Sequence, residues 1–199
     1  MKSKKYLAFF IFIILSISNI SYSYSIEPDV FVQSTVNRAS KVLSGNFSKE
    51  EKIEKLKNIA SETVDIKILG LYTLGSYRKS LNDDQKKEYE ILFRQYFLKT
   101  FSSRLAEYSN PEIQVISKEK LNKNYTMVSS VLVSTEQRPE VIIDWRIYTK
   151  NPDKPLIRDL IVEGLSLART QKEEFASILS SNDNDINILI SKLDEFVNN

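Results

Sequence analysis

The chain has 199 residues, with 28 Lys and Arg against 26 Asp and Glu, so its formal net charge is +2. It contains no Cys and no His, which excludes disulfides, Cys–His nucleophiles, Ser-His-Asp triads and zinc sites made from the usual ligands. Its four Gly form no glycine-rich phosphate loop, and the charge balance lacks the basic excess of a nucleic-acid-binding protein.

The first 25 residues have the pattern of a secretory signal peptide. Three of the first five residues are Lys, Leu7–Leu15 is continuously apolar, and Ser23 and Ser25 place small residues where a signal peptidase cleaves. The apolar run is shorter than the roughly 20 residues of a membrane-spanning helix, which favours cleavage over a retained anchor. Removing residues 1–25 takes three basic residues and no acidic one, which leaves a net charge of about −1. We expect residues 26–199 to form one domain outside the cytoplasm.

Two helices are predicted in the segment after the leader. The first opens at Pro28 or Asp29 and ends near Gly45, and its apolar residues recur at spacings of three and four. The second begins with Ser48 and Glu51, a capping box in which each side chain accepts a hydrogen bond from the other residue's backbone amide.

Asp65 is placed to cap a third helix over residues 66–77. Its expected buried positions are Ile68, Leu69, Tyr72 and Leu74. Gly70 and Gly75 each cost about 1 kcal/mol relative to Ala inside a helix. We therefore expect another element to approach this helix closely at the glycines.

The longest helix is predicted from Asn82, with a capping box to Gln85, to about Tyr108. One face of it carries an apolar, mostly aromatic stripe: Tyr89, Leu92, Phe93, Tyr96, Phe97, Phe101 and Leu105. Such a stripe is typical of a packed core, but stiff rings on one helix also suit the wall of an apolar cavity. The sequence leaves both interpretations open.

After Pro111 the apolar period changes to two, which indicates strands. We predict strands over 112–116 and 125–133 with a polar connection at 118–123, then a hairpin whose strands are 141–148 and 157–162. A helix with a capping box from Thr170 to Glu173 and a last helix capped at Asn184 or Asp185 follow. The predicted fold is α+β, with helices wrapped around a strongly twisted four-stranded antiparallel sheet.

Three stretches together resemble the MlaC family of periplasmic phospholipid carriers, also called the toluene-tolerance family. They are VDIKILGLYTLGSYRKSL, EILFRQYFLKTFSSRL and DLIVEGLSLARTQKEEFASIL, and their order and spacing extend the resemblance from about Glu27 to Leu193. The resemblance implies a periplasmic carrier that holds phospholipid tails in an apolar pocket between sheet and helices and catalyses no reaction. It also implies an outer-membrane lipoprotein complex and an inner-membrane ABC transporter as partners, between which the carrier shuttles lipid and maintains outer-membrane asymmetry.

Candidate site residues follow from the stripe and from the most apolar strand faces. The expected pocket wall is Leu92, Phe93, Tyr96, Phe97, Val131, Val133, Ile143, Trp145, Ile147 and Ile161. The expected head-group or docking rim is Arg78, Lys79, Arg94 and Arg104. We expect no catalytic residue, no metal and no cofactor, with bound phospholipid as the cargo.

Three alternatives remain open. The family resemblance also covers a branch associated with hopanoid pathways. A hydrolase could use paired carboxylates such as Asp144 and Asp159, which the hairpin could bring near each other. An adaptor protein would use the same apolar residues only as core.

Overall fold

Six α-helices, one 3-10 helix and a five-stranded sheet are present in residues 25–136 and 138–199, which the computed structural model describes. The helices are α2 (Pro28–Ser44), α3 (Lys49–Thr63), α4 (Ile66–Thr73), η1 (Gly75–Lys79), α5 (Asp83–Leu105), α6 (Leu167–Ser180) and α7 (Ile186–Asn198). The strands are β1 (Ile113–Asn122), β2 (Tyr125–Leu132), β3 (Val141–Tyr148), β4 (Leu156–Val162) and β5 (Leu165–Ser166). Residues 1–24 of the expected signal peptide lie outside the described residues. None of the described helices has the length and hydropathy to cross a membrane.

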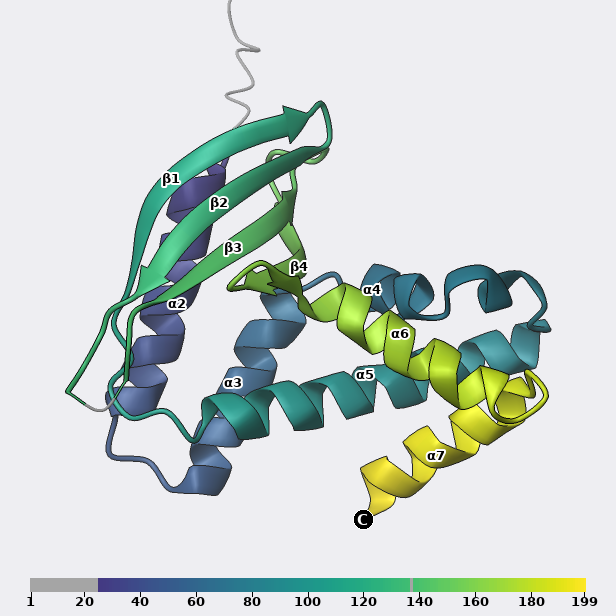
Figure 1. Ribbon diagram of the computed structural model, residues 1–199. Coiled ribbons are helices and arrows are strands. Elements are labelled where there is room, and N and C mark those ends of the chain that lie inside the picture. The colour runs from purple at the N-terminus through teal and green to yellow at the C-terminus, as the bar shows by residue number, and fades with distance from the viewer. Residues whose placement is uncertain (1–24, 137) are drawn as a thin grey trace, which may run out of the picture.

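The strands form an antiparallel meander in the order β1-β2-β3-β4-β5. This confirms the α+β class and the antiparallel sheet, with the two-residue β5 added to the four expected strands. Helix α2 runs behind the sheet in Figure 1. Val32 and Val36 of α2 pack with Val128, Trp145 and Ile147 in one core cluster. Burial alternates along β2, as successive side chains of a strand point to opposite faces of the sheet.

A second core cluster lies among the helices. In Figure 1, α5 crosses below the sheet, and α4, α6 and α7 gather on its right. Buried side chains from α4 through α7 fill the space between these helices, including Ile66, Tyr89, Phe93, Phe175 and Leu189. We call this second cluster the helical cluster, and the one between α2 and the strands the sheet–α2 cluster. They share no buried residue, so the molecule has two apolar centres.

The predicted helix caps at Ser48, Asp65, Asn82 and Asp185 are confirmed, because each side chain accepts a hydrogen bond from an amide of its own first turn. The cap predicted from Thr170 is wrong. Helix α6 begins three residues earlier, at Leu167, and Ser166 accepts a hydrogen bond from the amide of Arg169.

The expected close approach at Gly70 is confirmed. A Cβ placed on Gly70 would lie 2.7 Å from a ring carbon of Phe93, so only glycine lets α5 pack this closely on α4. Gly75 has a φ of 56° and ends the helical path, so α4 stops at Thr73 and a 3-10 turn follows.

Two other expectations for the polypeptide path are wrong. Of the four residues expected to be buried on this helix, Leu74 is buried and Leu69 packs against the helical core. Ile68 and Tyr72 are exposed instead, because α4 buries Ile66, Gly70 and Thr73. The segment 118–123, expected as a polar connection, mostly continues β1, which pairs with β2 as far as Asn122. Its exposed edge position tolerates the charged residues that resembled a loop.

Candidate lipid-binding site

The aromatic stripe of α5 changes from closed core to a partly open surface along the helix. Tyr89 and Phe93 are fully buried at its start, whereas Phe97 and Phe101 are only half-buried. Ring centroids are 5.7 Å apart for Tyr89 and Phe93, 6.4 Å for Phe93 and Phe97, and 5.4 Å for Phe97 and Phe101. These contacts stiffen one continuous row of rings, which is what a preformed apolar wall requires.

Tyr89 anchors the closed end of the stripe. Its hydroxyl is 2.8 Å from the Thr73 hydroxyl and donates a hydrogen bond to the Gly70 carbonyl at 3.2 Å. Burial raises the pKa of the Tyr89 phenol, so the group is a neutral donor there.

Tyr96 joins the stripe to the two C-terminal helices. Its ring lies 6.0 Å from that of Phe175 and 5.0 Å from that of Phe196, and its hydroxyl donates to Gln171 Oε1 at 2.9 Å. Desolvation raises the pKa of Tyr96, with the carboxylate of Glu174 adding to the shift. These contacts fix Tyr96 in the helical packing.

The sheet offers a second apolar surface, on the face covered by α2. Trp145 and Ile147 are buried there, and the Trp145 indole donates to Ser130 Oγ at 2.8 Å. Ile143 and Leu160 are half-buried and pack at the margin of the sheet–α2 cluster. Strand alternation could have predicted that Leu160 shares a sheet face with Trp145, its partner across β3 and β4. It could not predict how much of that face α2 covers.

The structure divides the predicted wall residues among three places. Leu92, Phe93, Tyr96 and Phe97 belong to the helical cluster, and Ile143, Trp145 and Ile147 to the sheet–α2 cluster. Val131 and Ile161 pair with Ile142 and Asp144, on the sheet face away from α2, and Val133 follows the end of β2.

Packing between the elements leaves the two apolar surfaces distinct. The helices that pack most closely on the sheet are α2, α4 and α6, whereas α5 packs on α3, α4 and α7. Because α5 does not pack closely on the sheet, the two do not cover each other's apolar surfaces. The open half of the α5 stripe and the margin of the sheet face therefore remain partly exposed.

The four predicted rim cations are exposed and do not form one cluster. Arg78 and Lys79 lie on η1, where Arg78 donates to the Gly75 carbonyl at 3.1 Å. Arg94 and Arg104 lie ten residues apart on α5, about 15 Å along the axis at 1.5 Å per residue. Any role for these cations in binding a head group stays a prediction.

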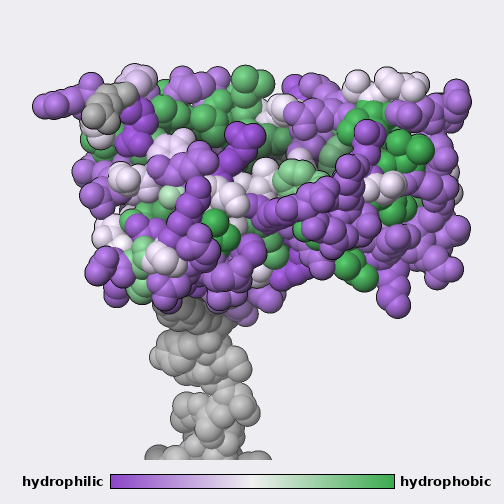
Figure 2. Space-filling model, turned by 90° about the horizontal axis from the view of Figure 1, so that it is seen from below, coloured by the Kyte–Doolittle hydropathy of each residue, from purple (hydrophilic) through white to green (hydrophobic). Residues whose placement is uncertain are grey.

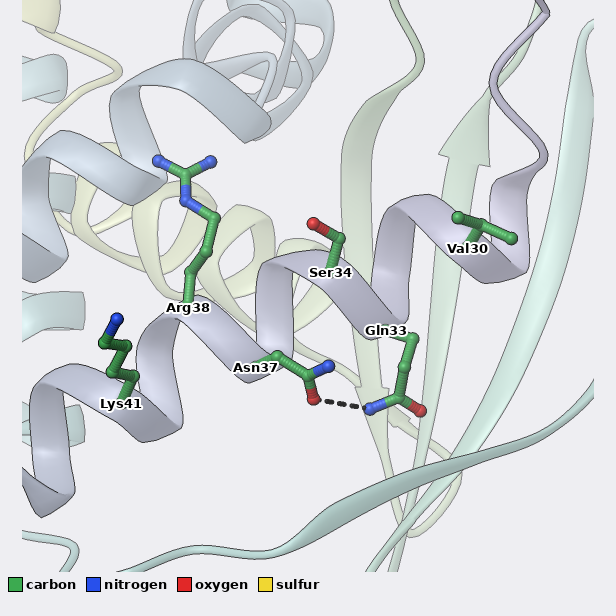
Figure 3. Close-up of a pocket in the computed structure, with 6 residues that line it drawn as sticks. All are labelled: Val30, Gln33, Ser34, Asn37, Arg38 and Lys41. Carbon is green, nitrogen blue, oxygen red and sulfur yellow. Dashed lines mark hydrogen bonds between the residues drawn. The ribbon is translucent and has the colours of Figure 1, made fainter.

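One open groove of about 470 Å³ runs along the outer side of α2 (Figure 3). Its lining is Val30, Gln33, Ser34, Asn37, Arg38 and Lys41, all from this one helix. Gln33 donates to Asn37 and to the Ile113 carbonyl and accepts from the Val115 amide, so it binds the edge of β1. The groove contains none of the predicted wall residues.

The two carboxylates of the hydrolase alternative have structural partners. Asp144 accepts a hydrogen bond from Ser129 Oγ at 2.6 Å. Asp159 is buried and accepts from Ser166 Oγ at 2.7 Å and the Ala168 amide at 3.1 Å, with Arg146 at 3.7 Å. Asp159 thus holds the start of α6 against β4. Across residues 25–136 and 138–199, no three His, Cys, Asp or Glu side chains gather as a metal site.

Apolar side chains also reach the surface. Figure 2 views the molecule from below and shows separate hydrophobic patches on a mostly hydrophilic surface.

Tyr108, just after α5, is 42% exposed. Sequence reasoning took Tyr108 only as the end of the helix and did not single out Arg138, whose guanidinium carbon lies 5.6 Å from the Tyr108 ring centroid. No local motif marks such a pair, because the two residues are thirty positions apart.

Comparisons with known proteins agree with this fold. The family model described as MlaC protein matches residues 33–195. The intermembrane phospholipid transport system binding protein MlaC of Haemophilus influenzae is 22% identical over 177 residues, which cover 85% of this chain and 81% of that protein. A crystal structure of a phospholipid-binding protein from Ralstonia solanacearum, in complex with a phospholipid, has a TM-score of 0.74 at 19% identity and covers 86% of this chain and 97% of that one. Since the family model spans most of its length, the chain belongs to the MlaC family.

Proposed function

We propose that this protein is a periplasmic phospholipid carrier that shields acyl chains from water. The observation that carries the proposal is that a protein with the same fold, from Ralstonia solanacearum, is described in complex with a phospholipid. The name of the Haemophilus influenzae relative, an intermembrane phospholipid transport system binding protein, supports the same function.

The energy of exposed acyl chains explains the need for a carrier. Each methylene exposed to water costs roughly 0.8 kcal/mol, so two chains of about fourteen methylenes cost on the order of 20 kcal/mol. A protein that covers the chains removes most of this barrier without a covalent step. The carrier function therefore assigns no catalytic role to Asp144 or Asp159, both of which have structural partners.

In this chain the open half of the α5 stripe and the margin of the sheet face are the surfaces suited to acyl chains. Phe97 and Phe101 supply half-buried rings on one side, and Ile143 and Leu160 supply half-buried aliphatic groups on the other. The fully buried Phe93 and Ile147 hold the two surfaces in place as core residues. Apolar lining with few directed polar groups favours selection by acyl chains over selection by head group.

We further propose that the carrier shuttles lipid between an outer-membrane lipoprotein complex and an inner-membrane ABC transporter, and thereby maintains outer-membrane asymmetry. Family membership supports this route. The test is deletion of the gene followed by chemical labelling of phospholipids at the cell surface. Unchanged surface phospholipid would contradict the route while leaving lipid binding intact.

Lipid binding itself is tested by solvent extraction of protein purified from its native compartment, followed by mass spectrometry. A carrier releases about one phospholipid per protein, a hopanoid-associated relative releases hopanoids, and an adaptor releases no stoichiometric lipid. Protein unfolded before purification and refolded without lipid is the control for adventitious contamination. Absence of stoichiometric lipid from the native protein would overturn the proposal.

A further inference from the structure

Among the residues that the structure describes, Arg138 has a buried guanidinium nitrogen with no hydrogen-bond partner. The residue lies in the loop between β2 and β3, and its Nε is buried yet unpaired. Its Nη2 makes one long hydrogen bond, 3.4 Å, to the Val133 carbonyl. Buried donors in native proteins nearly always have an acceptor, so one that lacks it needs an explanation.

No carboxylate in the described part of the chain neutralises this guanidinium. None of the ion pairs between described side chains includes Arg138. Glu136 and Glu140 lie two residues away on either side of Arg138, and Glu112 is hydrogen-bonded through its carbonyl to the Val133 amide. All three glutamates are exposed to solvent, which screens their effect on Arg138. The positive charge is therefore available to an anion.

Arg138 lies at the open end of the α5 stripe. Its guanidinium carbon is 5.6 Å from the ring centroid of Tyr108, within cation–π range. Tyr108 follows Phe101 by seven residues, and its amide donates to the Leu105 carbonyl, so it continues the last turn of the helix. Along this row the rings pass from the buried Phe93 to the exposed Tyr108. In Figure 1 the loop between β2 and β3 and the end of α5 lie on the same, left side of the molecule.

We propose that Arg138 binds the phosphate group of the carried phospholipid. The inference rests on the proposed function, because acyl chains along the α5 stripe place the polar end of the lipid at its exposed end. A guanidinium binds phosphate through two parallel N–H bonds, and Nε with Nη2 is one such donor pair. Since every phospholipid has a phosphate, the contact adds affinity for the whole class without selecting among head groups.

Three ligands test the assignment: phosphatidylglycerol, diacylglycerol with identical chains, and inorganic phosphate. Both lipids are delivered from cyclodextrin to lipid-free protein, and displacement of a fluorescent fatty acid measures binding. We expect the wild type to prefer phosphatidylglycerol over diacylglycerol by about tenfold or more, the worth of one charge-assisted contact. Arg138→Gln lowers this preference to within about twofold and leaves diacylglycerol binding unchanged. Arg169→Gln, an exposed arginine on α6 without an ion pair among the described side chains, is the matched control and keeps the preference.

The outcomes separate the inference from the proposed function. A wild type that binds neither lipid overturns the carrier function itself. A wild type that binds both lipids equally, an Arg138→Gln variant that keeps the preference, or one that loses both lipids alike overturns the Arg138 assignment alone. If Arg104→Gln loses the preference for phosphatidylglycerol and Arg138→Gln keeps it, the phosphate binds at the cationic rim predicted from sequence and not at Arg138. Displacement of phosphatidylglycerol by millimolar inorganic phosphate would identify a free phosphate site instead.

Discussion

Trp145 and Ser130 form a buried hydrogen bond between neighbouring strands: the indole Nε1 donates to Ser130 Oγ at 2.8 Å. Ser130 is fully buried, and its hydroxyl also donates to the Ile143 carbonyl at 3.1 Å. The hydroxyl thus gives a hydrogen-bond acceptor to an indole that is buried on the apolar face of the sheet. This pair ties β3 to β2 at the centre of the sheet–α2 cluster.

Ser130→Ala is expected to lower the free energy of unfolding by about 1–3 kcal/mol, because it leaves the buried indole N–H without an acceptor. Urea denaturation followed by Trp145 fluorescence measures the change. Ser180→Ala is the control, since its exposed hydroxyl bonds only within α6 and should cost about 0.5 kcal/mol or less. Equal unfolding free energies for wild type and Ser130→Ala would show that the indole finds another partner.

Gly70→Ala is expected to destabilise the protein by about 1–3 kcal/mol through overpacking against Phe93. Helix propensity alone predicts the opposite sign, a gain of about 1 kcal/mol. Thermal unfolding measures the net effect. The double variant Gly70→Ala with Phe93→Leu frees space for the new methyl group and should recover part of the loss relative to Phe93→Leu alone. A stabilising Gly70→Ala in the wild-type background contradicts the close contact.

Local signals predicted the features that depend on neighbouring residues. The caps at Ser48, Asp65 and Asn82 involve hydrogen bonds within three residues, and a short motif is enough to identify them. The glycine at position 70 pointed to a close approach because its propensity cost needs a compensating contact. Phe93, the residue in contact, is distant in sequence and was not identified. The presence of a glycine inside the helix was enough to predict that some element packs closely there.

The features that were predicted wrongly, or not at all, depend on how elements distant in the sequence pack on one another. The apolar residues of α4 surround the helix, so Ile68 and Tyr72 were as plausible in the core as Ile66 and Leu74. The aromatic stripe of α5 was evident in sequence, but the point where it leaves the core is set by α6 and α7, distant in the chain. Arg138 gave no local signal, because its place beside Tyr108 is a product of the whole fold.

Asp29→Asn should reduce stability at neutral pH by less than about 1 kcal/mol, since the pair with Lys118 is solvent-screened. The hydrogen bond from Lys118 Nζ, 2.8 Å long, holds the pKa of Asp29 below its ordinary value of 3.8. A depressed pKa means that the carboxylate stabilises the fold above the unfolded pKa and that this contribution is lost as pH falls through the folded value. The difference between wild type and variant should therefore vanish well below pH 3.8.

Denaturant titrations of both proteins at pH 7 and in strong acid measure this difference. High salt at pH 7 is the independent check, because 1 M salt shortens the screening length to about 3 Å and should shrink the difference. A difference that persists in strong acid would assign the effect of the substitution to the first turn of α2 rather than to the ion pair.

Trp145→Ala is expected to cost about 3–5 kcal/mol in unfolding free energy, as a core truncation does. The ring is only 8% exposed and packs in a cluster with Val32 and Val36. Lipid-free and lipid-loaded protein should show the same loss if packing against α2, and not cargo, accounts for the burial of the ring. A loss that appears only in the lipid-loaded protein would place Trp145 on the wall of the lipid site.

The last prediction separates wall from core along the α5 stripe. Phe93→Ala should cost about 3–5 kcal/mol in stability because its ring is 2% exposed and contacts Tyr89 and Phe175. Phe101→Ala should cost less, because the Phe101 ring is half-buried and stacks only on Phe97 among the described rings. If acyl chains complete the burial of Phe101, its truncation should lower lipid retention more than it lowers stability.

Brominated acyl chains supply a direct measurement, because bromine quenches indole fluorescence at near contact. With Trp145→Phe as background, Phe101→Trp puts a single indole at the open part of the stripe, since Trp145 is the chain's only tryptophan. We expect strong quenching of this reporter by brominated phospholipid and weak quenching of Trp145 in the otherwise unchanged protein, because its indole is buried in the sheet–α2 cluster. Stronger quenching at position 145 than at position 101 would reverse the assignment and move the acyl chains from α5 to the centre of the sheet.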